Sequence, residues 1–376
     1  MERLFFDHNA TTPIDPRVIE VMHKEMKMGP SNPSSIHSFG RAAKGRLAKA
    51  RETIAAYFGK RPKEFTFTSG GTESLHLAIL GLEPKRHIVT SSIVHAAISR
   101  LLDHLKTKGL EVTYLPVAPS GHVSPSDVEE SLRPDTDMII LSVANGETGI
   151  KTPIHEIAAL ASAHNIPFIV DGVALLGKET FSIPDGVTAM AFSSHKIHGP
   201  QGMGLLYHHK KCTLKPLFYG GGQESKRRSG TENLAGIIGL AKAIDLLNDE
   251  LPSATEKMEY LRDTFEKKLK ELIPGIQIIA PAPRLPNTSS ITFPNTDGEN
   301  LLIQLDMQGL AASMGSACSA GSLEPSGVLL AMGLSREEAL RTLRFSFSRF
   351  TTEEEIDRGS KLIASVYDAT KTMKKA

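Results

Sequence analysis

Lys196 is the first residue whose type and position suggest chemistry. It follows an apolar run, Ala189 to Ser193, and a Gly-Pro turn comes shortly after it. The end of a strand in an α/β sheet is where side chains meet a ligand cleft. The adjacent Ser193 and His195 can donate hydrogen bonds to an anion. On this segment alone, a solvated surface lysine is the commoner interpretation.

Asp171 places a carboxylate one strand earlier, at the end of the apolar run Phe168–Asp171. A pyridoxal phosphate (PLP) site needs a lysine for covalent attachment, an acid beside the pyridine nitrogen and hydrogen-bond donors for the phosphate. Asp171 can be that acid. It can equally cap a turn or helix at the strand end, and spacing alone leaves both roles open.

A glycine-rich turn, Thr68–Ser74, provides candidate phosphate donors. It follows a predicted strand and opens a predicted helix near Glu73. Small residues let backbone N–H groups approach an anion, and a helix N-terminus favours negative charge. Such turns are common for structural reasons alone. Together with Lys196 and Asp171, however, it completes the parts of a PLP site.

The elements that must position these residues alternate between strands and helices. Continuously apolar runs are typical of strands buried on both faces of a parallel sheet, and intervening amphipathic segments predict βαβ units. We predict strands at Glu64–Thr68, His87–Thr90, Glu111–Leu115, Met138–Val143, Pro167–Asp171, Ala189–Ser193 and Gly204–Tyr207, and helices at Ser92–Lys106, Ser124–Leu132 and Ile154–His164. The expected fold is therefore α/β with a mostly parallel sheet.

The pattern changes near residue 250. We expect Leu251-Pro252-Ser253 to end one helix and to start another that continues through Leu272. Isolated strands at Ile276–Ile279 and Ser289–Phe293 and a charged C-terminal helix from Thr352 then predict a smaller α+β domain. The predicted boundaries are 14–250 for the large domain and 251–376 for the small one, with 1–13 packing near the latter.

Composition narrows the possible functions. Of 376 residues, Lys and Arg total 43 and Asp and Glu 42, so a net charge of +1 argues against a nucleic-acid or membrane-surface protein. Two cysteines, Cys212 and Cys318, support no disulfide framework and favour a reducing compartment, which predicts a cytoplasmic protein. Neither a signal peptide, nor a long apolar span, nor a metal-ligand set is recognisable.

Several longer motifs carry a resemblance to one family. They include FFDHNATTP near the start, SNPSSIH at Ser31–His37, SSHKIHGPQGMG around Lys196, GGGQE at Gly220–Glu224, RSGTEN at Arg228–Asn233, GSACSAGSLEPS at Gly315–Ser326 and LRFSFSRFT ending at Thr351. Because these motifs follow one another in the same order as in the family, the chain resembles a cysteine desulfurase of the NifS/IscS group, in the class V family of fold type I PLP enzymes. The resemblance spans nearly the whole chain.

The resemblance implies a role for each matching residue. Lys196 would bind PLP covalently, Asp171 would pair with its ring nitrogen, and His95 would stack on the ring and move protons. The implied phosphate ligands are Gly71, Thr72, Ser193, His195 and, from the other subunit of a homodimer, Thr231; the implied substrate ligands are Asn9 and the carboxylate-binding Arg344.

Cys318 would be the nucleophile. It lies among small residues, typical of an exposed loop that could carry a thiolate between substrate and acceptor. The implied reaction converts L-cysteine to L-alanine, leaves a persulfide on Cys318 and delivers sulfur to an iron–sulfur scaffold or another acceptor protein. Cys212 lies outside every family motif and is interpreted as structural.

Two departures from the family pattern keep other functions open. Gly146 and Ala174 stand where an Asn and a Gln usually contact the phenolate oxygen of PLP, and His76 replaces a nearby Asn and could compensate as a donor. Losing a hydrogen bond to a charged group costs about 1.5–3 kcal/mol. The alternatives are a desulfurase-like partner protein with little activity, or a PLP enzyme for another amino acid such as selenocysteine.

Overall fold

A seven-stranded sheet forms the centre of the larger part of the molecule. The computed structural model describes residues 3–279, 283–315 and 324–373. The strands are β2 (Phe65–Thr68), β3 (His87–Ser91), β4 (Glu111–Leu115), β5 (Thr136–Ser142), β6 (Phe168–Asp171), β7 (Val187–Ser193) and β8 (Gly204–His208), in spatial order β2-β8-β7-β6-β5-β3-β4. β8 runs in the direction opposite to the other six strands, which are parallel to one another. The predicted strands and the mostly parallel sheet are therefore confirmed.

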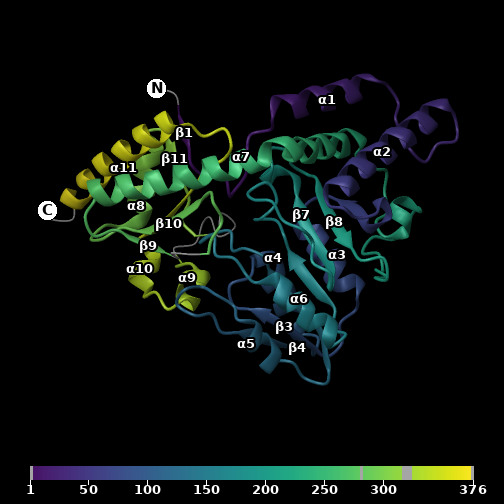
Figure 1. Ribbon diagram of the computed structural model, residues 1–376, viewed down its shortest axis with the longest axis horizontal. Helices are drawn as coiled ribbons and strands as arrows, with labels where there is room; N and C mark the ends of the chain where they lie inside the picture. The colour runs from purple at the N-terminus through teal and green to yellow at the C-terminus, as the bar shows by residue number, and fades with distance from the viewer. Residues whose placement is uncertain (1–2, 280–282, 316–323, 374–376) are drawn as a thin grey trace.

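Helices cover both faces of this sheet (Figure 1). One apolar core joins the sheet to α2 (Ser38–Tyr57), α6 (Ile154–Ala163) and the first half of α7 (Leu234–Leu272). The core on the opposite face contains side chains of α3 (Gly71–Gly81) and α4 (Ala96–Lys106). Alternate residues of β6 enter different cores, Val170 the first and Ile169 the second. Burial on both faces explains why the strands are continuously apolar.

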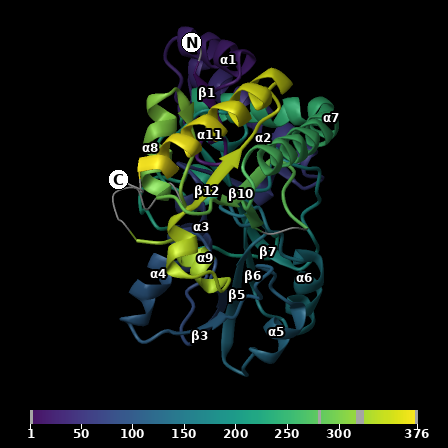
Figure 2. The ribbon, with the colours of Figure 1, turned by 90° about the vertical axis from the view of Figure 1, so that its left-hand side faces the viewer.

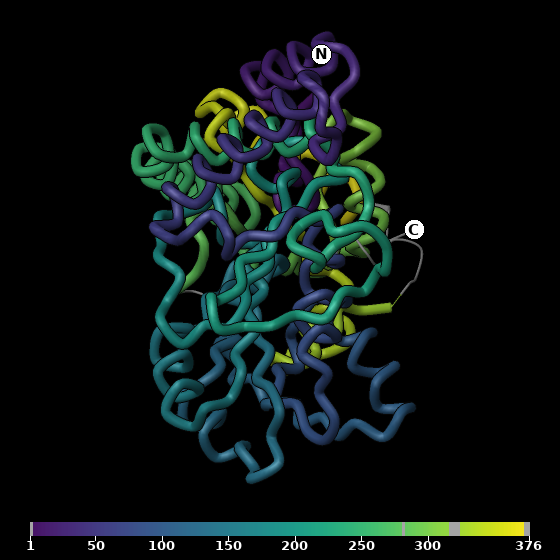
Figure 3. The backbone as a smooth tube through the Cα atoms, turned by 90° about the vertical axis from the view of Figure 1, so that its right-hand side faces the viewer, coloured from purple at the N-terminus to yellow at the C-terminus, as the bar shows by residue number. Residues whose placement is uncertain are grey.

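The remaining helices of the large part are short or peripheral. They are α1 (Pro16–Lys27), which packs on α7, α5 (Pro125–Glu130), and the 3-10 turns η1 (Pro62–Glu64), η2 (Ser194–Lys196) and η3 (Gln223–Lys226). The lowest part of the tube in Figure 3 contains only blue-to-teal segments of the large part. At the carboxyl ends of β3 and β4, Ile93 and Val117 pack in one apolar cluster with Val328 of the C-terminal part.

A three-stranded antiparallel sheet organises the second part. Its strands are β9 (Gln277–Ile279), β10 (Thr288–Thr292) and β12 (Thr342–Ser346), and α8 (Gly298–Met307) and α11 (Glu353–Met373) pack beside it (Figure 2). The short helices α9 (Gly327–Ala331) and α10 (Arg336–Leu340) complete it. β1 (Leu4–Phe5) pairs in parallel with β11 (Leu310–Ala311), so the N-terminal segment joins the C-terminal core.

The expected helix break at Pro252 is wrong, because α7 continues through it. Proline removes one backbone N–H from the helical hydrogen-bond ladder. Two nearby hydroxyls donate to carbonyls in this region, Ser253 Oγ to Glu250 O at 3.1 Å and Thr255 Oγ1 to Leu251 O at 2.8 Å. Both halves of α7 also bury apolar side chains in separate cores, so packing keeps the helix continuous. The two-domain boundary remains a prediction.

Candidate active site

Lys196 lies on η2, directly after β7 at the carboxyl edge of the large sheet. Its Nζ donates to the main-chain oxygens of Asn9 and, at 2.8 Å, Ala10. Thr12 Oγ1 donates to the carbonyl of His195 at 2.8 Å and accepts from the His198 N–H at 2.7 Å. The segment between β1 and α1 is therefore fastened onto the lysine turn by both backbone and side-chain contacts.

Asp171 ends β6, the strand beside β7, and its side chain is buried. Its Oδ1 accepts a hydrogen bond from the Val173 N–H at 3.0 Å. Burial raises the pKa of this carboxyl, while the hydrogen bond from the Val173 N–H and the nearby His95 and Lys196 oppose that rise. Asp171 thus caps the turn after its strand and also lies close to the proposed PLP lysine, so the two roles left open by the sequence coexist.

His95 occupies the N-cap of α4. Its Nδ1 accepts a hydrogen bond from the Ala97 N–H at 3.0 Å. An acceptor nitrogen carries no proton, so this bond places the proton of the neutral ring on Nε2. The His95 side chain is exposed, and it is close enough to Asp171 to affect the pKa of that carboxyl.

The glycine-rich turn approaches the Asp171 turn very closely. A Cβ built on Gly71 would lie 2.7 Å from Val173 Cγ2, a separation too short for a side chain. Gly71 begins α3, whose first N–H groups have no intrahelical acceptor. Ser193 is buried nearby at the end of β7, with Cβ 3.8 Å from the same built atom, and Thr72 is exposed. These residues form a cradle of donors beside Lys196.

Arg344 and Asn9 converge on one carbonyl oxygen, that of Gly146. Arg344 Nη1 donates to it at 3.0 Å and Asn9 Nδ2 at 3.1 Å. Arg344 is 4% exposed, and its Nη2 pairs with Asp7 Oδ1 at 2.6 Å. Its Nε has no hydrogen-bond partner among the described residues. Because Asn9 also contributes a carbonyl to Lys196, the structure brings the predicted substrate ligands and the lysine together.

Thr231 lies in the loop after η3. It lines a cavity of about 220 Å³ with Ser69 of the glycine-rich turn in the same chain. The ion pair between Arg228 Nε and Glu73 Oε1, 2.9 Å long, fastens this loop to α3. The predicted role of Thr231 in the other subunit's site remains a proposal.

Comparison with known proteins identifies the family of this chain. The model of the aminotransferase class-V family matches residues 4–358. The chain belongs to this family. It is 39% identical to the cysteine desulfurase IscS of Dictyoglomus turgidum, over 98% of this chain and 96% of that protein, and 39% identical to a putative cysteine desulfurase IscS 1 of Bacillus subtilis, over 97% and 99%. A solved NifS-like protein superposes with a TM-score of 0.91 at 36% identity, covering 98% of this chain and all of that one.

A further solved structure, SspA in complex with cysteine, has a TM-score of 0.82 at 34% identity, over 93% of this chain and all of that one. The predicted resemblance to the NifS/IscS group is thereby confirmed, as is the fold type I architecture. This class V aminotransferase is a PLP-dependent enzyme of the cysteine desulfurase group.

The residues of this class V enzyme fit PLP. The close approach at Gly71 leaves backbone donors free of side chains, and Ser193, His195 and Lys196 add hydroxyl, imidazole and amine groups to the same edge. Burial and the charge of Lys196 lower the pKa of His195 to about 4, so His195 is neutral at physiological pH. Its Nδ1 is 3.1 Å from Thr11 Oγ1.

The departure at Gly146 leaves space for a side chain. A Cβ at Gly146 would meet nothing within 4 Å, and Ala174 is half-buried. His76 Nε2 is bound to the Ala97 carbonyl at 3.0 Å, so this nitrogen is committed to α4. The proposed compensation by His76 therefore has at most its other ring nitrogen available.

Cys318 lies outside the described residues. Cys212 is half-buried, and burial raises its thiol pKa to about 11, which fits a structural role. Among residues 3–279, 283–315 and 324–373, no metal-binding group of His, Cys, Asp or Glu gathers. No helix in those ranges is long and apolar enough to cross a membrane.

Sequence reasoning missed two charged groups at this site. Asp7 holds Arg344, and its position two residues before Asn9 was the available signal. Lys178, 3% exposed, donates to the main-chain oxygen of Lys196 at 3.2 Å. Lysines are almost never fully buried, and no local pattern around Lys178 distinguished it from a surface residue.

Proposed function

We propose that this chain converts L-cysteine to L-alanine and transfers the sulfur to Cys318 as a persulfide. The observation that carries the proposal is the convergence of Asn9 and Arg344 beside Lys196. A carboxylate-binding guanidinium next to the cofactor lysine suits an amino-acid substrate. The relatives named cysteine desulfurase support cysteine as that amino acid.

Bound PLP supplies an electron-accepting ring that stabilises negative charge at the substrate's α-carbon. Lys196 would hold PLP covalently, and Gly71, Thr72, Ser193 and His195 would bind its phosphate. Asp171 would keep a proton at the pyridine nitrogen. Burial raises the Asp171 pKa, and the Val173 N–H, His95 and Lys196 oppose that rise; a protonated pyridine nitrogen beside the carboxyl would favour the carboxylate further.

Arg344 and Asn9 orient the substrate. Arg344 Nε faces no other acceptor among the described residues, and Asp7 neutralises the guanidinium so that it can remain buried. His95 receives and returns protons at its exposed ring. The Cys318 sulfur bonds to the substrate sulfur as the latter leaves its β-carbon, and the β-carbon takes a proton before alanine departs.

We also propose a homodimer, in which Thr231 reaches the phosphate of the other subunit. Apolar side chains are exposed beside two family motifs: Ile36 is 91% exposed, Phe39 59%, Phe218 52% and Tyr219 85%. The same motifs, 31–37 and 220–224, line a shared cavity of about 620 Å³. Large exposed apolar groups favour coverage by a partner. The proposed location is the cytoplasm, and the acceptor an iron–sulfur scaffold or another sulfur-accepting protein.

The test measures sulfide and alanine formed from L-cysteine by the PLP-loaded protein with a reductant. Lys196→Ala and Cys318→Ala are compared with it. Equimolar products that disappear in both variants would support the proposal. Bound PLP without product would indicate another amino acid, with selenocysteine tested next, and neither PLP nor product would indicate a non-catalytic partner.

A further inference from the structure

Lys178 lies directly beneath the turn that carries Lys196. Its Nζ donates to the Lys196 carbonyl at 3.2 Å, and its own carbonyl accepts from Thr255 Oγ1 of α7 at 2.9 Å. Gly177 has φ 75°, and a Cβ there would lie 2.7 Å from Ile197 Cγ2. The segment that follows Asp171 therefore packs against the turn containing Lys196 and is hydrogen-bonded to α7.

The groups that face Lys178 are basic. Burial, then the charges of Lys196 and Arg349, lower its pKa to about 7. Burial and then Lys178 itself lower the pKa of His8 and His198 to about 3. Lys196 lies on η2 and His198 directly after it, whereas His8 follows β1 and Arg349 follows β12. Near neutral pH, Lys178 therefore exists in both charged and neutral forms.

A purely structural role explains this arrangement poorly. A buried amine that is even partly charged carries a desolvation cost, and the positive charges of Lys196 and Arg349 increase it. A methionine would fill similar volume without that cost. What only the lysine provides is a donor to the Lys196 carbonyl and a positive charge close enough to Lys196 for the two to repel, which opposes the attraction between Lys196 and Asp171.

We propose that Lys178 is a positioning residue for Lys196, which both orients the lysine turn and favours the neutral amine needed to bind PLP. The inference rests on the proposed role of Lys196. Charge repulsion between two lysines is mutual, so a charged Lys178 disfavours protonation of Lys196, and a neighbouring cation is a known way to activate a lysine nucleophile. In the attachment reaction, the Lys196 nitrogen bonds to the PLP aldehyde carbon, and both amine hydrogens leave with the aldehyde oxygen as water.

The experiment follows PLP attachment to the PLP-depleted full-length protein by absorbance between pH 6 and 9. In Lys178→Met, we expect the pH midpoint of the attachment rate to rise by about one unit, with a roughly tenfold lower rate at neutral pH. Lys178→Gln keeps a donor without the charge, so its final PLP occupancy should match that of the wild type, while its pH midpoint should stay raised. Thr255→Val removes the contact to the Lys178 carbonyl together with the one to the Leu251 carbonyl but leaves the Lys178 amine in place, so it should keep the wild-type midpoint.

A wild-type midpoint in Lys178→Met would overturn the inference, as would an equal shift in Thr255→Val. If circular dichroism shows that Lys178→Met is unfolded, Lys178→Gln decides, and a wild-type midpoint there also overturns it. Borohydride reduction and peptide mass analysis test the parent proposal separately. PLP fixed to another lysine would refute the role of Lys196, whereas PLP on Lys196 with unchanged midpoints would refute only the role of Lys178.

Discussion

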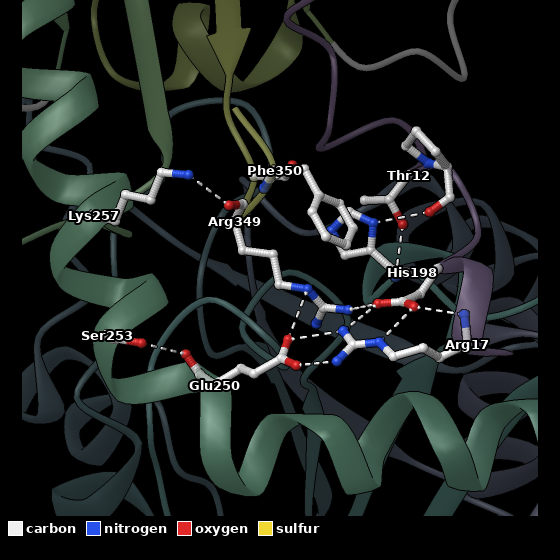
Figure 4. A network of polar contacts seen from close by, with 11 residues as sticks. Thr12, Arg17, His198, Glu250, Ser253, Lys257, Arg349 and Phe350 are labelled. Carbon is white, nitrogen blue, oxygen red and sulfur yellow. Dashed lines mark hydrogen bonds and ion pairs between the residues drawn. The ribbon is translucent and has the colours of Figure 1, made fainter. Parts of the chain in front are cut away.

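Asp15→Asn should lower the free energy of unfolding by about 3 kcal/mol at pH 7. Asp15 is 1% exposed, and its Oδ2 pairs with Arg349 Nη2 at 2.6 Å and with Arg17 Nη2 at 2.7 Å. Figure 4 shows Arg17, Arg349 and Glu250 meeting in this network. Asp15 Oδ1 also caps α1 by accepting from the Arg17 N–H at 2.9 Å. Asparagine keeps an oxygen for that cap, so the substitution isolates the ion pairs.

The magnitude follows from the exposure of the two arginines. The Arg17 side chain is 45% exposed, and such a pair contributes about 0–1 kcal/mol. The Arg349 side chain is 9% exposed, and breaking a buried pair from one side costs about 3–5 kcal/mol. Glu250 Oε2 remains 3.4 Å from Arg349 Nε and offsets part of the loss, which places the expected value at the lower end.

The pH dependence has a definite sign. Hydrogen bonds from Arg17 hold the Asp15 pKa well below its ordinary value, so its contribution is complete above about pH 4 and disappears as pH falls through the folded-state pKa. His8 and His198 are buried and neutral in the folded protein, with pKa values near 3. Because their imidazoles take up protons in the unfolded chain below about pH 6.5, the free energy of unfolding falls there in wild type and variant alike. The difference between the two proteins should therefore stay constant from pH 7 to 5.

Urea unfolding followed by far-UV circular dichroism measures this difference, with both proteins loaded with PLP. Asp135→Asn is the matched control, because Asp135 pairs with Arg133 at the surface and its loss should leave the free energy of unfolding nearly unchanged. A loss below 1 kcal/mol in Asp15→Asn would refute the reasoning. So would a difference that already shrinks between pH 7 and 5.

Three further substitutions test the site. Asp7→Asn removes the anion that holds Arg344, and steady-state kinetics should show the KM for L-cysteine raised about 10- to 100-fold with a smaller change in kcat; an unchanged KM would contradict the pairing. Gly146→Asn with Ala174→Gln should slow PLP dissociation and shift its absorbance spectrum, since Gly146 has room for a side chain, and an identical spectrum and rate would show that the departures are neutral. Cys212→Ala should leave sulfide production unchanged because its thiol is protonated at pH 8, which iodoacetamide labelling of the wild type can check; loss of activity would oppose its structural assignment.

The large sheet could be predicted from the sequence because strands buried on both faces have no polar alternation. Asp171 and Lys196 could be placed together because adjacent parallel strands present their carboxyl ends at one edge. These inferences need only local pattern and general topology.

The other half of the site could not be predicted in this way. Asn9 reaches Gly146 and Lys196 across long sequence separations, and only the folded chain shows those contacts. The break expected at Pro252 failed because intrinsic propensity gave way to packing in two cores. Lys178 was missed because burial of a lysine depends on tertiary surroundings.

The pairing of Asp7 with Arg344 has a consequence for biosynthesis. The two residues are 337 positions apart, so Asp7 leaves the ribosome long before its counter-ion has been translated. N-terminal segments generally fold while synthesis continues. During that interval Lys196 emerges ahead of Arg344, so a nascent chain contains the residues proposed to hold PLP before it contains the residue proposed to bind the substrate carboxylate. A stop codon before β12 would therefore give a polypeptide with the proposed cofactor lysine and without the proposed carboxylate ligand.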